Sequence, residues 1–423
     1  MSDNKIKILP QSLSNKIAAG EVVNRPDSAV KELIENSIDA KADHITLIVR
    51  DAGKSLIQII DNGQGMTEDD AVMSLQRHST SKISSYEDIE NILTLGFRGE
   101  ALASISSVSQ IELKTKTASE DVGVLLKAEG GEVTEISKTQ CETGTSIAIR
   151  NLFYNTPGRR NFLKSDQTEF RHIYETFIRL AVSNPDTGFK FINNDEEVFD
   201  LKPSSLRERL INVFTNKMSE SLIEVDYGNE LIKIKGFISK PNFTKKSKQD
   251  QYFYLNNRFF VSKSLNFSVY TGYDDLIEKG DYPSFFLFIE IDPKKVDVNV
   301  HPSKMEVKFE DESAVFGFVR RAVKEALKKA DLVFEVGFDS KLDLPDTQES
   351  FHYKQSGNTS GQKFSGSSNY QRRDFDIPKR ENTSNIHSQY FEASRKPEEI
   401  EENDEFAIPQ ADEQKHIRAY KKI

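Results

Sequence analysis

The stretch KELIENSIDA, residues 31–40, decides how the first part of the chain must fold. Its polar residues Glu32, Asn36 and Asp39 recur at i, i+4 and i+7, and about 100° of rotation per residue places them on one helix face. The other side takes the apolar residues Val30, Leu33, Ile34 and Ile38. Taken alone, this pattern is also that of an ordinary amphipathic helix with its polar stripe in water.

Composition limits the classes of protein to consider. The chain has 423 residues, 37% hydrophobic and 29% charged, which is enough for two or three domains with substantial cores. The absence of a long apolar run and of a signal-peptide pattern predicts a cytoplasmic protein with no membrane partner. The single cysteine, Cys141, excludes a disulfide framework within the chain and a zinc site built on several thiolates.

The charge balance constrains contact with nucleic acid. The formal net charge is −10, so the surface as a whole does not attract DNA. Any DNA contact must come from a local basic groove, and it should weaken as salt is added.

Periodicity divides the chain into three parts. Residues 1–204 alternate strand-like and helical patterns, which predicts an α/β domain, and residues 205–336 do the same, which predicts a second α/β domain. Residues 337–423 are rich in Ser, Gly, Gln and Asn and then acidic, which is typical of a disordered linker or tail. The expected helices are 28–40, 68–78, 169–182 and 312–330, and the clearest strands are 44–49, 56–60, 231–239, 251–261 and 284–292.

A second motif, LIQIIDNGQGM at residues 56–66, ends an apolar strand in Asp61. A carboxylate in this place can accept a hydrogen bond from an exocyclic amine, and Gly63 and Gly65 leave room for a flat purine. A plain tight turn explains the same residues, because Asp-Asn-Gly is common turn chemistry.

Two further motifs suit phosphate oxygens. In GFRGEALASISSV, Gly96 and Gly99 precede a helix of small residues, whose first N–H groups can bind an anion. In RHSTSKI, the residues Thr80, Ser81 and Lys82 bring hydroxyls and an ammonium together. A glycine-containing cap and a solvated polar loop remain the alternatives. In TGTSIAIRNLF, the Thr145 hydroxyl at the entry to a strand can reach a base edge.

The sequence contains neither a P-loop nor a dinucleotide-binding fingerprint, so a nucleotide site must be of another kind. Taken in order, ELIENSIDA, DNGQGM, GFRGEALASI and GTS resemble the four motifs of the ATPase superfamily that joins gyrases, heat-shock chaperones, histidine kinases and MutL. The longer stretches IAAGEVVNRPDSAVKELIENSIDA, LFYNTPGRRNFLK and VDVNVHPSKMEVKF resemble the MutL family of DNA mismatch-repair proteins. The resemblance covers residues 5–310.

The resemblance implies a fold, two cofactors and residue roles. The fold is an ATPase domain of α+β sandwich type, then an α/β domain resembling a ribosomal-protein fold, and the cofactors are ATP and Mg²⁺. Glu32 is implied as the general base and Asn36 as the Mg²⁺ ligand, with Asp39 in support. Asp61 is implied to recognise adenine, near Gly63, Gly65 and Thr145.

The triphosphate is implied to lie under a lid formed by residues 77–102. Its nucleotide contacts are expected from Thr80, Ser81, Lys82, Gly96, Phe97, Arg98, Gly99, Glu100, Ala101 and Leu102. Lys304 is implied to reach from the second domain to the γ-phosphate and to act in catalysis.

The same resemblance implies a DNA clamp and its partners. ATP binding would dimerise two copies around DNA, and family position favours Arg258 in a groove that faces DNA. Lys245 and Lys246 beside aromatic residues, and Arg159 and Arg160 in GRRNFLK, are further basic candidates. A charged surface strand explains the first cluster, including Arg258, and domain packing explains the second equally well. The expected partners are a MutS-type mismatch-recognition protein and a downstream nuclease or helicase, with the protein associated with the nucleoid during repair. The endonuclease motif and the dimerisation domain found in this family are not expected in the chain.

Two alternatives belong to other functional classes. A kinase of the same ATP fold would need an acceptor histidine on a dimerising helix before Lys31, and no such helix fits there. A DNA-binding scaffold that does not hydrolyse ATP would not need the intact set of Glu32, Asn36 and Asp61.

Overall fold

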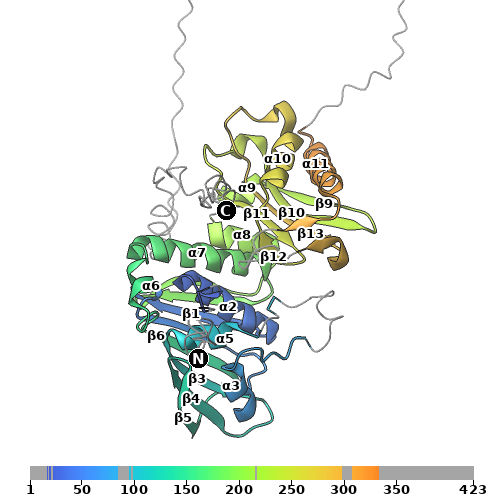
Figure 1. The fold of residues 1–423 in the computed structure, drawn as a ribbon. Coiled ribbons are helices and arrows are strands. Elements are labelled where there is room, and N and C mark those ends of the chain that lie inside the picture. The colour runs from blue at the N-terminus through green and yellow to red at the C-terminus, as the bar shows by residue number, and fades with distance from the viewer. Residues whose placement is uncertain are drawn as a thin grey trace, which may run out of the picture. The chain divides into compact units, whose positions relative to one another are not determined.

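A computed structural model of the protein describes seven groups of residues, namely 17, 19–20, 22–83, 95–96, 99–214, 217–297 and 307–332. They form two large sheets with covering helices (Figure 1). The described helices are α2 (Pro26–Asp39), α3 (Glu68–Ser74), α5 (Ala101–Ser107), α6 (Pro157–Asn161), α7 (Asp166–Ser183), α8 (Leu206–Phe214), α9 (Lys217–Ser221), α10 (Lys263–Tyr273) and α11 (Glu312–Lys329).

The first sheet has eight strands in the order β5-β4-β3-β6-β2-β1-β7-β8. Their bounds are β1 (His44–Arg50), β2 (Leu56–Asp61), β3 (Gln110–Lys116), β4 (Gly123–Glu129), β5 (Glu132–Thr139), β6 (Gly144–Arg150), β7 (Gly188–Asn193) and β8 (Glu196–Leu201). Neighbouring strands are antiparallel except β1 and β7, which are parallel. Burial alternates along β1 and β3, so one face of the sheet is packed and the other is partly open.

Helix α2 carries the polar face identified in the sequence. Pro26 occupies its first turn, where the missing N–H costs nothing, and this sets the start two residues before the predicted Ser28. The apolar residues Val30, Leu33 and Ile34 are buried as expected. Helices α2 and α7 pack against each other over the sheet, and α5 contacts α2 (Figure 1). Burial of the apolar stripe therefore fixes the rotation of α2 about its axis.

The second sheet has the order β12-β11-β13-β10-β9. Its strands are β9 (Leu222–Gly228), β10 (Ile232–Ser239), β11 (Gln251–Leu255), β12 (Arg258–Phe260) and β13 (Phe285–Ile291), and a separate pair joins β14 (Val296–Asp297) to β15 (Lys308–Phe309). Helices α10 and α11 pack on the sheet around Leu265, Val269 and Val323. Helix α10 lies between β12 and β13 along the chain, in the crossover between the parallel strands β11 and β13.

Arg209 of α8 and Tyr254 of β11 connect the second part of the chain to the first. Arg209 of α8 is fully buried, and its guanidinium donates to the carbonyls of Ala181, Pro185, Thr187 and Lys202. Burial lowers the pKa of Arg209 to about 10, so it stays charged at neutral pH. The Tyr254 hydroxyl of β11 donates to the Arg179 carbonyl of α7 at 3.0 Å. A hydrogen bond thus connects the second sheet directly to α7.

The predicted α/β architecture is confirmed for both parts. The predicted helices appear, although α3 ends at Ser74 rather than at residue 78. The predicted strands appear as well, but the stretch 251–261 forms the antiparallel pair β11 and β12, because Asn256 and Asn257 take positive φ values and make a turn between them. The domain boundaries at 204 and 336 stay predictions, and the proposed tail at 337–423 lies outside the described residues. Among the described helices, none is long and apolar enough to cross a membrane.

Candidate functional site

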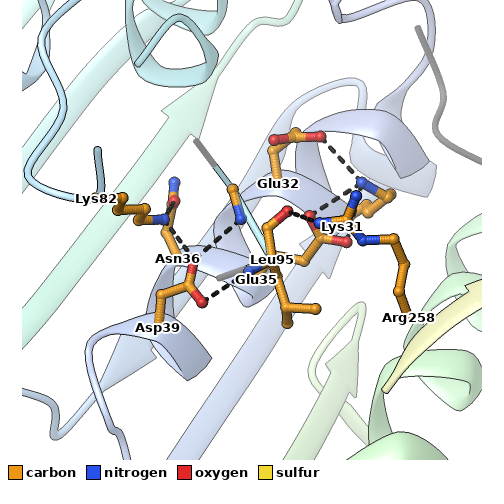
Figure 2. A network of polar contacts seen from close by, with 9 residues as sticks. Lys31, Glu32, Glu35, Asn36, Asp39, Lys82, Leu95 and Arg258 are labelled. Carbon is orange, nitrogen blue, oxygen red and sulfur yellow. Dashed lines mark hydrogen bonds and ion pairs between the residues drawn. The ribbon is translucent and has the colours of Figure 1, made fainter. Parts of the chain in front are cut away.

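The polar face of α2 gathers a cation and two backbone amides (Figure 2). The Lys82 ammonium donates to Asn36 Oδ1 at 2.8 Å and to Asp39 Oδ2 at 2.6 Å. The amides of Leu95 and Gly96 donate to the two Asp39 carboxylate oxygens at 3.0 and 3.1 Å. Asp39 therefore organises the segment around it, and its supporting role in a nucleotide site stays a prediction.

One turn earlier on α2, Lys31 joins two carboxylates. Its ammonium lies 3.0 Å from Glu32 Oε1 and 3.0 Å from Glu35 Oε2. Burial alone would lower the pKa of Lys31, but the carboxylates of Glu35 and Glu32 outweigh burial and raise it. The Glu32 side chain is 19% exposed and Glu35 only 4%, so Glu32 is the more accessible of the two carboxylates.

Asp61 lies at the end of β2, where three donors converge on its carboxylate. The Ser37 hydroxyl of α2 donates to Oδ2 at 2.7 Å, and the amides of Gly63 and Thr145 donate to Oδ1 at 3.0 and 3.3 Å. Burial raises the pKa of Asp61, while these three hydrogen bonds lower it, and burial prevails. The carboxylate is thus held in a fixed orientation by both α2 and β6.

The glycines after Asp61 are required by the chain itself. Gly65 has φ +70°, and a Cβ at this position would lie 2.0 Å from the Lys116 carbonyl oxygen. A Cβ at Gly63 would lie 2.8 Å from the Ala40 carbonyl oxygen. Close backbone packing at the end of β2 therefore requires these two glycines, and the room for a purine beside them stays a prediction.

The Thr145 hydroxyl does not stand alone. Its Oγ1 lies 3.0 Å from Thr115 Oγ1, and Thr115 also accepts from the Met66 amide at 2.9 Å. The two threonines lie on the neighbouring strands β6 and β3 and face each other across the sheet. They tie the DNGQG turn to the centre of the sheet beside Asp61.

The predicted phosphate residues are described only in part. The Thr80 hydroxyl accepts from the Lys82 amide at 3.1 Å, and Ser81 is exposed. Gly99 has φ +62° and packs closely on the Ser79 backbone. Glu100 lies 3.3 Å from His78 and precedes α5, which begins at Ala101 and continues through Leu102. Phe97, Arg98 and Lys304 lie outside the described residues.

The predicted DNA-contact residues lie in three different settings. Arg258 of β12 donates to the Leu95 carbonyl at 2.8 Å, so its guanidinium faces the first domain (Figure 2). Lys245 and Lys246 are paired with Asp250 and Asp281 of their own domain. Arg159 lies against Gly20, and Arg160 is exposed on α6. The DNA role of all five stays a prediction.

Several site residues were not identified from the sequence. They are Lys31, Glu35, Ser37, Leu95 and Thr115. A signal was present for Glu35, because Lys31 and Glu35 are spaced i, i+4 and this spacing favours an ion pair. Ser37 gave no such signal, since its partner Asp61 is 24 residues away.

Two sequence families match the chain. Residues 24–143 match the family described as histidine kinase-, DNA gyrase B-, and HSP90-like ATPase, and residues 210–328 match the family described as DNA mismatch repair protein, C-terminal domain. The chain is 44% identical over 382 residues to the DNA mismatch repair protein MutL of Christiangramia forsetii, covering 87% of this chain and 62% of that protein. The chain belongs to the MutL family.

Further relatives agree with this assignment. MutL of Chlorobaculum tepidum is 49% identical over 346 residues, which cover 80% of this chain and 55% of that protein. The chain therefore spans somewhat more than half the length of these two MutL relatives. Membership of the MutL family does not favour the kinase or the scaffold alternative.

Solved structures confirm the predicted fold type. A structure described as the N-terminal domain of a DNA repair protein superposes with a TM-score of 0.64 at 27% identity, covering 75% of this chain and 98% of that chain. The ATPase domain of the mismatch repair endonuclease MutL from Aquifex aeolicus superposes with a TM-score of 0.51 at 27% identity, covering 71% and 99%. The first domain has the ATPase fold of the gyrase, histidine kinase and MutL type.

Proposed function

We propose that this MutL-family chain binds ATP with Mg²⁺, hydrolyses it, and uses the cycle to operate a clamp on DNA in mismatch repair. One observation carries the proposal. Helix α2 presents Asn36 and Asp39 to the Lys82 ammonium on one face, while Ser37 of the same helix holds the Asp61 carboxylate. A single rigid element thus joins a region suited to phosphates and a cation with a region suited to a base.

Asp61 would select adenine. Its carboxylate is held by three donors, and a carboxylate in its ionised form accepts a hydrogen bond from the exocyclic amine of adenine. The Thr145 hydroxyl, next to Asp61 in the sheet, would contact the base directly or through water. Guanine carries a carbonyl where adenine carries the amine, so the same carboxylate would repel it.

The residues around Asn36 fit a divalent cation. Asn36 Oδ1 and Asp39 Oδ2 already converge on one positive charge, the Lys82 ammonium, and oxygen is the ligand that Mg²⁺ prefers. When bound, Mg²⁺ would neutralise negative charge on the phosphate oxygens. Asn36 would supply one oxygen to it, and Lys82 would turn its ammonium toward the phosphates, together with the other residues that we predict in the lid at 77–102.

Glu32 would orient a water molecule and accept its proton. The Lys31 ammonium lies 3.0 Å from Glu32 Oε1, and a general base accepts a proton in its ionised form. Glu32 lies on the same face of α2 as Asn36, one turn away, so base and cation ligand face one triphosphate. Lys304 would add a positive charge at the γ-phosphate.

Family membership supports the proposed clamp. Two copies of the chain would dimerise when ATP binds and would enclose DNA at the nucleoid, with Arg258, Lys245, Lys246, Arg159 and Arg160 in contact with it. A MutS-type protein would recruit the clamp, and a downstream nuclease or helicase would be its output. The local basic residues suit phosphate contacts, which are independent of base sequence.

Substitution of the base tests the proposed chemistry. Glu32→Ala should abolish release of phosphate from Mg-ATP while the affinity for ATP stays within a few-fold of the parent value, because Glu32 acts on water and not on the nucleotide. Asp61→Asn is the matched comparison, since it should weaken binding itself. Phosphate release at the parental rate by Glu32→Ala would show that another group is the base.

A further inference from the structure

We propose that Arg258 is a positioning residue that couples the second domain to the nucleotide site, by holding the Leu95–Gly96 segment against Asp39 of α2. The inference rests on the proposed function, because it gives that segment a place beside the bound nucleotide. It assigns Arg258 a role within one copy of the chain that does not require DNA.

The Leu95–Gly96 segment is held from two sides. On one side, the amides of Leu95 and Gly96 donate to the Asp39 carboxylate at 3.0 and 3.1 Å. On the other side, the Leu95 carbonyl accepts from Arg258 Nη2 at 2.8 Å. Figure 2 shows the Arg258 side chain extending from its strand toward Leu95, with Asp39 beyond it on α2. A carboxylate and a guanidinium from different domains thus bind opposite ends of one short backbone segment.

The charges of the two partners reinforce one another. A negative carboxylate at the amides and a positive guanidinium at the carbonyl both polarise the intervening peptide groups in the same direction. The Asp39 side chain is only 9% exposed, so solvent screens these interactions weakly. Removal of either charged group should therefore loosen the segment more than the loss of a surface hydrogen bond would.

The connection continues to the cation-binding oxygens. Asp39 also accepts from Lys82, and Lys82 donates in turn to Asn36. Arg258 is therefore linked through Leu95, Asp39 and Lys82 to the oxygen that we propose for Mg²⁺. Because coupling between two sites is reciprocal, nucleotide binding should change the exchange of amides around Arg258, and loss of Arg258 should change nucleotide affinity.

Hydrogen exchange of the full chain tests the coupling without DNA. In Arg258→Ala without nucleotide, the amides of Leu95 and Gly96 should exchange about tenfold faster or more, as expected for loss of a hydrogen bond to a charged group. Affinity for ADP, which cannot turn over, should fall in the same variant. In the parent, ADP should also slow the exchange of amides in β12, and this effect should disappear in Arg258→Ala.

Two variants separate this role from general damage. Arg207→Ala removes an equivalent guanidinium–carbonyl hydrogen bond, 2.8 Å to Ser219, far from Leu95 in the chain, and should leave Leu95 exchange unchanged. Tyr254→Phe removes a different hydrogen bond between the domains, that from the Tyr254 hydroxyl to the Arg179 carbonyl, and should leave Leu95 exchange within two- to threefold of the parent.

The inference would be overturned if the Leu95 amide exchanged at the parent rate in Arg258→Ala. It would also be overturned if Tyr254→Phe raised the Leu95 exchange rate as much as Arg258→Ala does, because the effect would then come from domain docking as a whole. Failure of the proposed function looks different. In that case the parent chain itself would not bind ADP, whereas the exchange of Leu95 in the two variants would still report on the contact.

Discussion

Ser37→Ala probes the support of Asp61 by α2. The parent hydroxyl is buried and donates to Asp61 Oδ2 at 2.7 Å, whereas its second contact, to the Leu33 carbonyl, is longer at 3.3 Å. The variant leaves Asp61 with the amides of Gly63 and Thr145 alone. It adds no bulk, so a change in behaviour reports on the missing hydrogen bond.

The expected magnitude follows from the two terms that the substitution changes. A hydrogen bond to a charged group contributes about 1.5–3 kcal/mol, and alanine is favoured over serine in a helix interior by about 0.5 kcal/mol. The net loss in the free energy of unfolding should therefore be about 1–2.5 kcal/mol at neutral pH. Affinity for ATP should also fall, because the carboxylate that accepts from adenine is less firmly oriented.

The loss should depend on pH in a definite direction. Burial already raises the pKa of Asp61 above its ordinary value of 3.8, so the folded parent loses stability as pH rises through that pKa. Ser37→Ala removes a hydrogen bond to the ionised form and raises this pKa further. The difference in the free energy of unfolding between variant and parent should be largest at neutral pH. It should shrink as the solution is acidified and Asp61 becomes protonated.

Urea denaturation at several pH values measures this difference, and Ser104→Ala is the control. Ser104 is fully buried, and the described residues supply no hydrogen-bond partner for its hydroxyl, so its removal should cost little. The assigned role of the Ser37 hydroxyl would be refuted if Ser37→Ala did not lower the free energy of unfolding, lowered it only as much as Ser104→Ala does, or lowered it equally at every pH.

Two other predictions concern backbone and charge. Gly65→Ala should destabilise the first domain by at least about 3 kcal/mol, because it combines a left-handed backbone with a clash at the Lys116 carbonyl. Thermal unfolding measures this loss, and Gly158→Ala is the control, because a Cβ there meets nothing within 4 Å. Lys304→Ala should strongly reduce ATP turnover and ATP-induced protease protection while Lys308→Ala retains both; equal behaviour would remove Lys304 from the site.

The sequence by itself determined the local elements and their faces. The spacing of Glu32, Asn36 and Asp39 predicts one helix face, and α2 has this face because its apolar residues must be buried. The end of β2 at Asp61 and the glycines after it are equally local, since they depend on alternation and on turn geometry. The family motifs then predicted that these elements bind and hydrolyse ATP.

Only the tertiary structure decided which of these groups meet. Ser37 and Asp61 are 24 residues apart, Lys82 and Asp39 are 43 apart, and Arg258 and Leu95 are 163 apart. Such partnerships depend on strand order and on how helices and domains pack, and no local pattern encodes these distances. The sequence could assign Arg258 a positive charge and a DNA groove, but its position against Leu95 depends on how the second sheet packs against the first domain.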